Sequence, residues 1–370
     1  VKGNEPYQML GEFGDDLAAA LGFEIDVRPV MGRNTMFGFP CENWKPLKLF
    51  DGTEVLVPGM FNITVEPSGD WLIYPEGDMS VPPSGRMPKD GFYFDAICRQ
   101  QPLDESNLSV DDNLEEFKPL ADEDVAWLVN AAENAAKEGK AAILSAPGTA
   151  FGDIALVPAL WLKSPKGIRD VASWYMATAA NRDHVYAIFE SQCEIALDNL
   201  ALLAEKLGDN VQAVFTTGTD FGTQNGLFIS PQSYRDLFQP FHRQINNFIH
   251  ENTNWKVFIH SCGSVVDLIP DFIESGFDIL NPVQCSAAGM EAEGLKRRFG
   301  DRITFWGGAV NTQQTLPFGT PQEVYDEVRR RIDIFGRDGG FIFNSIHNIQ
   351  AGTPVENVLA MFRALSDSLR

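Results

Sequence analysis

From about residue 120 to the end of the chain, short apolar runs alternate with helical stretches. A strand, a helix and a second strand in succession favour parallel pairing through a right-handed crossover. Six such units can be read, and less regular strands upstream could supply two more. We therefore predict an α/β fold, a TIM-type (β/α)8 barrel, with a doubly wound open sheet as second choice. The expected strands are 141–148, 211–218, 256–260, 277–281, 303–308 and 340–344.

The N-terminal part of the chain has a different pattern of apolar and turn-forming residues. Residues 47–82 read as short strands separated by Asp-Gly, Pro-Gly and Ser-Gly-Asp turns, which predicts an antiparallel β meander. Residues 83–118 are rich in Pro, Asp and Gly, and we expect a long lid or wrapping segment. We therefore expect an N-terminal extension, residues 1–118, packed on a barrel catalytic region, residues 119–370, with one structural domain overall.

Charge and cysteine usage narrow the class of protein. The net charge is −22, from 29 basic and 51 acidic residues, so the chain should be repelled by nucleic acid and by anionic membranes. No run of 18 apolar residues is present, and the first ten residues lack the pattern of a signal peptide. The five cysteines are odd in number and form no CxxC. Reduced thiols in a cytoplasmic protein are therefore expected.

Small or polar residues follow each of the six expected strands. A barrel enzyme builds its site from the loops at the C-terminal ends of its strands, so these residues should share one mouth. Each of them alone could be an ordinary turn former, but the set as a whole favours a functional site. The candidates are Asp220, Gln224, Asn225, His260, Cys262, Asn281, Gln284, Asn311, Asn344 and His347.

The most specific pair is His260 and Cys262, at the end of the strand 256–260. Residues two apart in an extended chain face the same side, so imidazole and thiolate could bind one zinc ion. A lone H-x-C is a weak signal, and packing or strand capping would also explain it. A third ligand could be His347, after the last strand, or Cys285. Three protein ligands with one open position are typical of a catalytic zinc.

Four segments of the chain carry a family resemblance. "GTDFGTQNGLFISPQSYRDLFQPFHRQI", "HSCGSVVDLIPDFIESGFDILNPVQ", "WGGAVNTQQTLPFGTPQEV" and "GTPVENVLAMFRAL" resemble the uroporphyrinogen decarboxylase superfamily, in particular its corrinoid-dependent methyltransferase branch. The resemblance covers roughly residues 120–370. It implies a (β/α) barrel with the site in its mouth, and it is compatible with a homodimer.

The resemblance also bears on the metal. Methyltransferases of this branch that act on thiols carry zinc on an H-x-C pair and a distant cysteine, which falls six residues before a Thr-Pro. In this chain the pair matches His260 and Cys262, but the residue six before Thr353 is His347. Imidazole can replace thiolate as a zinc ligand, with a more electrophilic metal as the result. Relatives that pass the methyl group to tetrahydrofolate need no activated thiol and can lack zinc.

The decarboxylase branch carries an N-terminal Met-Arg-Gln-Ala-Gly-Arg stretch whose arginines bind substrate carboxylates. The first 45 residues of this chain contain only Arg28 and Arg33 and no such stretch. Because guanidinium groups are the natural partners of a polyacidic tetrapyrrole, this difference counts against that substrate.

We therefore expect a methyltransferase that moves a methyl group between cobalamin, carried by a partner corrinoid protein, and a small acceptor such as a thiol or tetrahydrofolate. The alternatives are a uroporphyrinogen decarboxylase of porphyrin biosynthesis and a non-catalytic binding protein. The expected metal ligands are His260, Cys262 and His347, which with Asp220 form the catalytic set. The expected substrate-binding residues are Gln224, Asn225, Asn281, Gln284, Asn311 and Asn344.

Overall fold

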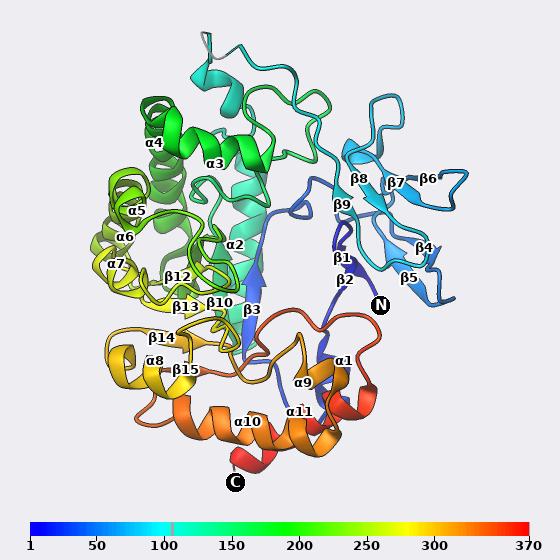
Figure 1. The fold of residues 1–370 in the computed structure, drawn as a ribbon, viewed down its shortest axis with the longest axis vertical. Coiled ribbons are helices and arrows are strands. Elements are labelled where there is room, and N and C mark those ends of the chain that lie inside the picture. Colours follow the sequence, from blue (N-terminus) through cyan, green and yellow to red (C-terminus); the bar gives the residue numbers. More distant parts are fainter. Residues whose placement is uncertain (105–106, 370) are drawn as a thin grey trace. The chain divides into compact units, whose positions relative to one another are not determined.

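The central element of the computed structural model, which describes residues 1–104 and 107–369, is a seven-stranded parallel sheet (Figure 1). Its strands are β3 Val27–Val30, β10 Ala141–Ser145, β11 Ala213–Thr217, β12 Lys256–His260, β13 Ile279–Asn281, β14 Thr304–Trp306 and β15 Phe341–Ile342. Each strand pairs in parallel with its neighbour in the sequence. A doubly wound sheet would reverse this order at a switch point, so that second choice is wrong.

The sheet is curled. Ile143, Phe215, Phe258, Ile279 and Trp306 come from five consecutive strands and pack in one cluster. The rings of Phe258 and Trp306 have centroids 5.2 Å apart although β13 lies between their strands. Strands two apart in a flat sheet are separated by about 9.6 Å, so the contact requires a concave face. These side chains therefore form the inner face of a partial barrel.

The prediction of an eight-stranded barrel is confirmed only in part. Among the described residues the sheet has seven strands rather than eight, and the edge strands β3 and β15 do not pair with each other. Two upstream strands were expected to complete the barrel, but only β3 joins the parallel sheet. The remaining upstream strands form antiparallel sheets, in which their backbone N–H and C=O groups pair with one another rather than with the parallel sheet.

Helices flank the strands of this sheet (Figure 1). They are α1 Asp15–Ala20, α5 Pro231–Leu237, α6 Gln239–Asn252, α7 Ile269–Glu274, α8 Ala292–Phe299, α9 Thr315–Phe318, α10 Pro321–Phe335 and α11 Val355–Ser368. The start of α10 shows why the sequence folds this way locally. Thr320 accepts the backbone N–H of Glu323, the Glu323 carboxylate accepts that of Thr320, and Pro321 occupies the first turn.

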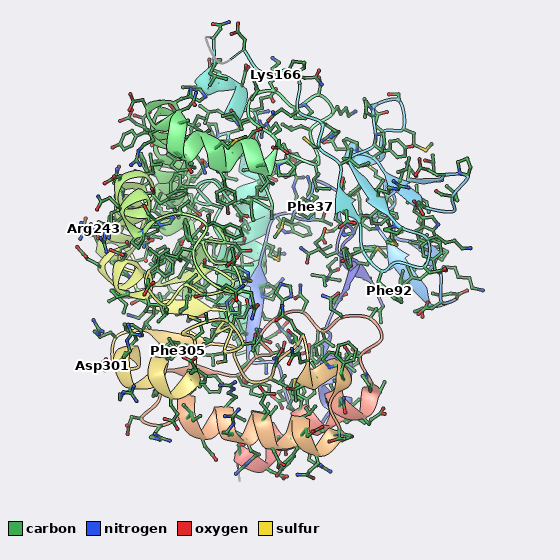
Figure 2. The ribbon with its side chains drawn as sticks, viewed as in Figure 1. Phe37, Phe92, Lys166, Arg243, Asp301 and Phe305 are labelled. Carbon is green, nitrogen blue, oxygen red and sulfur yellow. The ribbon has the colours of Figure 1, made fainter. Side chains whose placement is uncertain are left out.

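Apolar side chains on the inner faces of these helices build the core. Val324 and Val328, four residues apart on α10, pack with Ala360 and Ala364, four apart on α11. Phe305 of β14, which is labelled in Figure 2, is fully buried. On an amphipathic helix the polar residues lie on the opposite, outward face.

The aromatic-rich part of the chain is antiparallel. Its strands are β1 Gly3–Glu5, β2 Leu10–Gly11, β4 Lys45–Lys48, β5 Glu54–Val57, β6 Ile63–Val65, β7 Trp71–Ile73, β8 Gly85–Met87 and β9 Asp95–Ala96. The pairs β4–β5 and β6–β7–β8–β9 confirm the predicted meander. The meander extends to β8 and β9, within the segment that was expected to be a wrapping lid. Tyr7, Phe37, Phe39, Phe61 and Phe94 form the centre of its core.

The chain divides into two compact units that interleave along the sequence. One contains residues 1–14, 31–131 and 152–195, and the other contains 15–30, 132–151 and 196–370. This differs from the single boundary expected at residue 118, because residues 15–30, which carry β3, belong with the parallel sheet and residues 119–131 and 152–195 belong to the first unit. The helices α2 Asp122–Lys137 and α4 Arg182–Leu207 contribute residues to both units, and α3 Val171–Ala180 belongs to the first. None of the described helices is long and apolar enough to cross a membrane.

Arg169 organises the irregular segment of the first unit. Its guanidinium is 1% exposed and forms two hydrogen bonds with the carboxylate of Glu116, at 2.8 and 3.0 Å. The same side chain donates to the backbone carbonyls of Lys166 and Asp112. A buried guanidinium needs several acceptors, and these contacts hold together a segment that has little regular structure of its own.

Glu5 of β1 is a buried carboxyl group in the first unit. It is 9% exposed, and its oxygens accept the backbone N–H groups of Tyr7 and Gln8. Burial raises the pKa of Glu5 from 4.5 to about 7, although the two N–H groups oppose the shift. The folded chain therefore binds this proton more tightly than the unfolded chain. The resulting stabilisation is fully present below pH 4.5 and is lost as the pH rises through 7.

We expect Glu5→Gln to remove this pH dependence, because the amide oxygen still accepts an N–H while carrying no charge. Relative to the variant, the wild-type chain should lose about 3 kcal/mol of unfolding free energy between pH 4.5 and pH 8. Urea unfolding at several pH values measures the difference. The same change at the exposed Glu12 is the control. Parallel pH profiles for wild type and Glu5→Gln would contradict the assignment.

Candidate functional site

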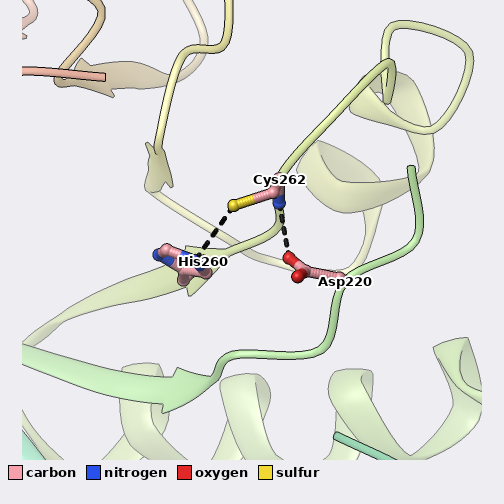
Figure 3. Close-up of side chains that lie close together, drawn as sticks. All are labelled: Asp220, His260 and Cys262. Carbon is pink, nitrogen blue, oxygen red and sulfur yellow. Dashed lines mark hydrogen bonds between the residues drawn. The ribbon is translucent and has the colours of Figure 1, made fainter. Parts of the chain in front are cut away.

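Three side chains capable of binding a metal gather at the C-terminal ends of β11 and β12 (Figure 3). They are Asp220, three residues beyond β11, His260, the last residue of β12, and Cys262 in the loop that follows. One ligand atom from each lies within 4.8 Å of the other two. Within residues 1–104 and 107–369, this is the one group of three or more His, Cys, Asp and Glu side chains that meets this criterion. Carboxylate, imidazole and thiol groups therefore converge where the fold predicts a site.

The strand β12 explains why His260 and Cys262 meet. Phe258 packs on the inner face of the sheet, and alternation along the strand places His260 on the same face. The Sγ atom of Cys262 lies 3.4 Å from Nε2 of His260. The Oδ1 atom of Asp220 accepts the backbone N–H of Cys262 at 2.6 Å, so Asp220 fixes the loop that carries the thiol.

The surroundings of Cys262 favour the neutral thiol. Burial raises the pKa of Cys262, and the negative charge of Asp220 and its hydrogen bond raise it further. A thiol in such a place is unreactive by itself, because the thiolate is the nucleophile and the metal ligand. A cation between the three groups would reverse this balance, since it would neutralise Asp220 and stabilise the thiolate.

Asn281 at the end of β13 is the direct neighbour of His260. The two residues are paired in the register of β12 and β13, so their side chains share a face. The Oδ1 atom of Asn281 lies 2.7 Å from Nδ1 of His260, and its Nδ2 atom donates to the carbonyl oxygen of Trp306 at 3.0 Å. Asn281 was predicted to bind substrate, but both ends of its amide contact protein atoms.

Gln284 and Gln224, also predicted to bind substrate, form a strut between loops. The backbone N–H of Gly263 donates to Oε1 of Gln284 at 2.8 Å. Gln284 donates to Oε1 of Gln224 at 2.9 Å, and Gln224 donates to the carbonyl of Ser286 at 2.7 Å. The loops after β11, β12 and β13 are therefore linked through two amide side chains.

Two glycines that sequence reasoning missed allow these loops to touch. A Cβ atom on Gly222 would lie 2.7 Å from the carbonyl oxygen of Cys262 and 2.8 Å from the nitrogen of Ser264. Gly263 has a φ of +84°, and a Cβ atom there would clash with the Gly222 carbonyl. The signal was present in the sequence, since both glycines come two residues or fewer after a predicted site residue.

The remaining predicted substrate-binding residues are Asn225, Asn311 and Asn344. The Oδ1 atom of Asn311 accepts the backbone N–H groups of Gln313 and Gln314, which makes it the cap of a turn. Asn225 and Asn344 are exposed. They remain predictions as ligands for a substrate.

The predicted metal trio of His260, Cys262 and His347 is not assembled. His347 lies outside the ligand group, and Asp220 takes the third place. The reason is strand order, since β11 pairs with β12 whereas β15 lies three strands away. The pKa of His347 is lowered by loss of solvent and then by His260, while Asp220 opposes the shift. His347 therefore lies within electrostatic range of the group but beyond ligand distance.

Cys285, the competing third ligand, is also outside the group. It is buried, and burial raises the pKa of its thiol to about 11. Arg331 and Glu327 of α10 are the charged residues that act on it most strongly. Cys285 is therefore a buried thiol that does not belong to the group of Asp220, His260 and Cys262.

The two N-terminal arginines have acidic partners. Arg28 of β3 pairs with Asp15 and Glu138, at 2.6 and 2.8 Å. Arg33 pairs with Asp124 at 2.8 Å and also with Glu123. Both guanidinium groups are therefore engaged within the chain.

Comparison with known proteins identifies the family. The model of the family described as uroporphyrinogen decarboxylase (URO-D) matches residues 115–367. A uroporphyrinogen decarboxylase from Pseudoalteromonas atlantica is 26% identical over 170 residues, 43% of this chain and 45% of the relative. A methylated-thiol–coenzyme M methyltransferase from Methanosarcina mazei is 25% identical over 226 residues, 61% of this chain and 52% of the relative.

A solved structure described as a methyltransferase from Methanosarcina mazei covers 70% of this chain and 70% of its own, with a TM-score of 0.47 and 17% identity. The chain spans about half the length of the curated relatives it matches. The extent of the family match, most of the parallel sheet included, decides the assignment: the chain belongs to the uroporphyrinogen decarboxylase (URO-D) family and resembles its methyltransferase branch.

Proposed function

We propose that this chain is a methyltransferase that moves a methyl group between a corrinoid, bound to a partner protein, and a small acceptor. The observation that carries the proposal is the convergence of Asp220, His260 and Cys262 at the C-terminal ends of two neighbouring strands. This is where a barrel of this type performs its chemistry. The transfer depends on holding acceptor and methyl group in line, which is a positioning task for a rigid site.

The three side chains fit a zinc ion. Zinc takes nitrogen, sulfur and oxygen ligands in tetrahedral geometry, with bonds that put neighbouring N and S ligands about 3.5 Å apart. The Nε2–Sγ separation of 3.4 Å agrees with that spacing before any rearrangement. His260, Cys262 and Asp220 would hold the ion and leave one position open. When bound, the ion supplies Lewis acidity, which lowers the pKa of a coordinated thiol.

The residues around this group hold its geometry. Asp220 anchors the backbone of Cys262, and Gln284 anchors the next N–H of the same loop. The loops also lie in close contact at Gly222 and Gly263, where a Cβ atom on either residue would clash with the other loop. A site that must present three ligands and one open position depends on such supports, because a shift of 1 Å misaligns the reacting atoms.

A thiol is the acceptor that these contacts favour over tetrahydrofolate. A pterin would need several free amide and carboxylate groups, and Gln224, Gln284 and Asn281 already use theirs within the chain. A ligand that used these amides would have to replace hydrogen bonds that they make within the chain, and at the buried Asn281 an amide left without a partner is costly. The Methanosarcina mazei relative, whose name gives a methylated thiol and coenzyme M, supports the same choice.

The second candidate is uroporphyrinogen decarboxylation, which the family description and several relatives name. That substrate carries many carboxylates, so its binding calls for free guanidinium groups. Arg28 and Arg33 hold acidic partners instead. Methyl transfer therefore remains the preferred function.

The ligand set can be tested with metal alone. We expect the purified full chain to bind one zinc ion. His260→Ala, Cys262→Ala and Asp220→Asn should each weaken binding by more than the roughly 10–100-fold typical of an outer-shell partner. His347→Ala should change the affinity by less than that, because its ring lies beyond ligand distance. Competition with a chromophoric chelator gives the affinities. A large loss in His347→Ala together with none in Asp220→Asn would restore the trio expected from the sequence.

The reaction can be tested with free methylcobalamin as donor. Zinc-loaded chain with coenzyme M should demethylate it, seen as a change in its visible spectrum, and the rate should fall at least about 100-fold in Cys262→Ala. Tetrahydrofolate in place of the thiol is the comparison. Stepwise loss of carboxylates from uroporphyrinogen, followed by chromatography, would instead favour the decarboxylase. Tight binding of methylcobalamin with no spectral change for any acceptor would favour a binding protein.

A further inference from the structure

The direction of the hydrogen bonds around Asn281 can be worked out from chemistry alone. The backbone carbonyl of Trp306 can only accept, so the amide group of Asn281 must turn its nitrogen toward it. The amide oxygen then faces Nδ1 of His260, at 2.7 Å. Because that oxygen also can only accept, the proton must be on Nδ1.

The position of this proton decides what the other nitrogen can do. A neutral imidazole with hydrogen on Nδ1 carries its lone pair on Nε2. Nε2 is the atom that faces Sγ of Cys262, at 3.4 Å. The lone pair can therefore accept the thiol hydrogen when the site is empty and bind a cation when one is present.

We propose that Asn281 is a positioning residue, which holds His260 in the Nδ1–H tautomer and thereby directs its Nε2 lone pair toward Cys262 and a metal bound there. The link to metal binding rests on the proposed function, whereas the tautomer itself does not. Outer-shell partners of this kind orient ligating histidines in many metal sites. Asn281 is suited to the task because it is 9% exposed and its own orientation is fixed by the Trp306 carbonyl.

This role differs from the substrate-binding role predicted from the sequence. A substrate that used the Asn281 amide would have to compete with two protein partners for it. The neighbouring strands keep those partners in place, since β13 pairs with β12 on one side and with β14 on the other. The geometry therefore assigns the amide to the histidine.

The tautomer can be read directly by nitrogen NMR of the full chain labelled with 15N-histidine, without metal, at about pH 8.5, where an ordinary imidazole is neutral. The signals of His260 are identified by their loss in His260→Gln. We expect Nδ1 to give the resonance of a protonated nitrogen and Nε2 that of an unprotonated one. In Asn281→Leu the two resonances should move together or exchange positions, because nothing then holds the proton on Nδ1.

Two further variants separate the role of the amide from general damage. Asn281→Asp keeps an acceptor for Nδ1–H and should keep the wild-type pattern. Asn254→Leu makes the same change as Asn281→Leu at an exposed asparagine just before β12, and should leave the His260 signals unchanged. Circular dichroism confirms that each variant is folded. A wild-type spectrum with the proton on Nε2, or an unchanged tautomer in folded Asn281→Leu, would overturn the proposal.

Zinc affinity gives a second readout. Asn281→Leu should bind zinc about 10–100-fold more weakly than wild type, while Asn281→Asp should stay within the lower end of that range. Equal affinities for Asn281→Leu and wild type would overturn the link to metal binding. If the wild-type chain binds no zinc, the metal part of the proposed function fails, and the nitrogen spectra still decide whether Asn281 sets the tautomer.

Discussion

Parallel pairing in strict sequence order is the constraint on which the rest of the structure depends. Because each strand lies beside its neighbour in the chain, all carboxyl ends meet at one side of the sheet. The curl, shown by the contact between Phe258 and Trp306, turns these ends toward one another. A flat sheet would spread the same loops along a line.

The candidate site is held by polar contacts as much as by the sheet. Asp220 combines two roles, because its carboxylate fixes the Cys262 backbone and opposes ionisation of the Cys262 thiol. The first role favours a rigid site, and the second favours the neutral thiol, which is a poor nucleophile. A structural support and an electrostatic control thus come from one side chain, and substitutions there would affect both.

The sequence predicted the sheet, the meander and the meeting of His260 with Cys262, because periodicity two and strand ends are local properties of the chain. It could not tell which third side chain would complete the group. That depends on strand neighbours, and β11 rather than β15 lies next to β12. It also could not tell that Gln284 and Asn281 form hydrogen bonds within the chain. Their partners, Gly263 and Gln224 for Gln284 and His260 and Trp306 for Asn281, come from other strands and loops.

The contact between Gly222 and Gly263 restricts which residues can occupy these two positions. Neither position has room for a Cβ atom, because each glycine lies against the loop that carries the other. Both positions must therefore be glycine for this contact to form, although they lie far apart in the chain. A related sequence that keeps the H-x-C pair but carries a bulkier residue at either glycine must route these loops differently. The pair of glycines therefore identifies this particular loop arrangement better than the H-x-C pair does.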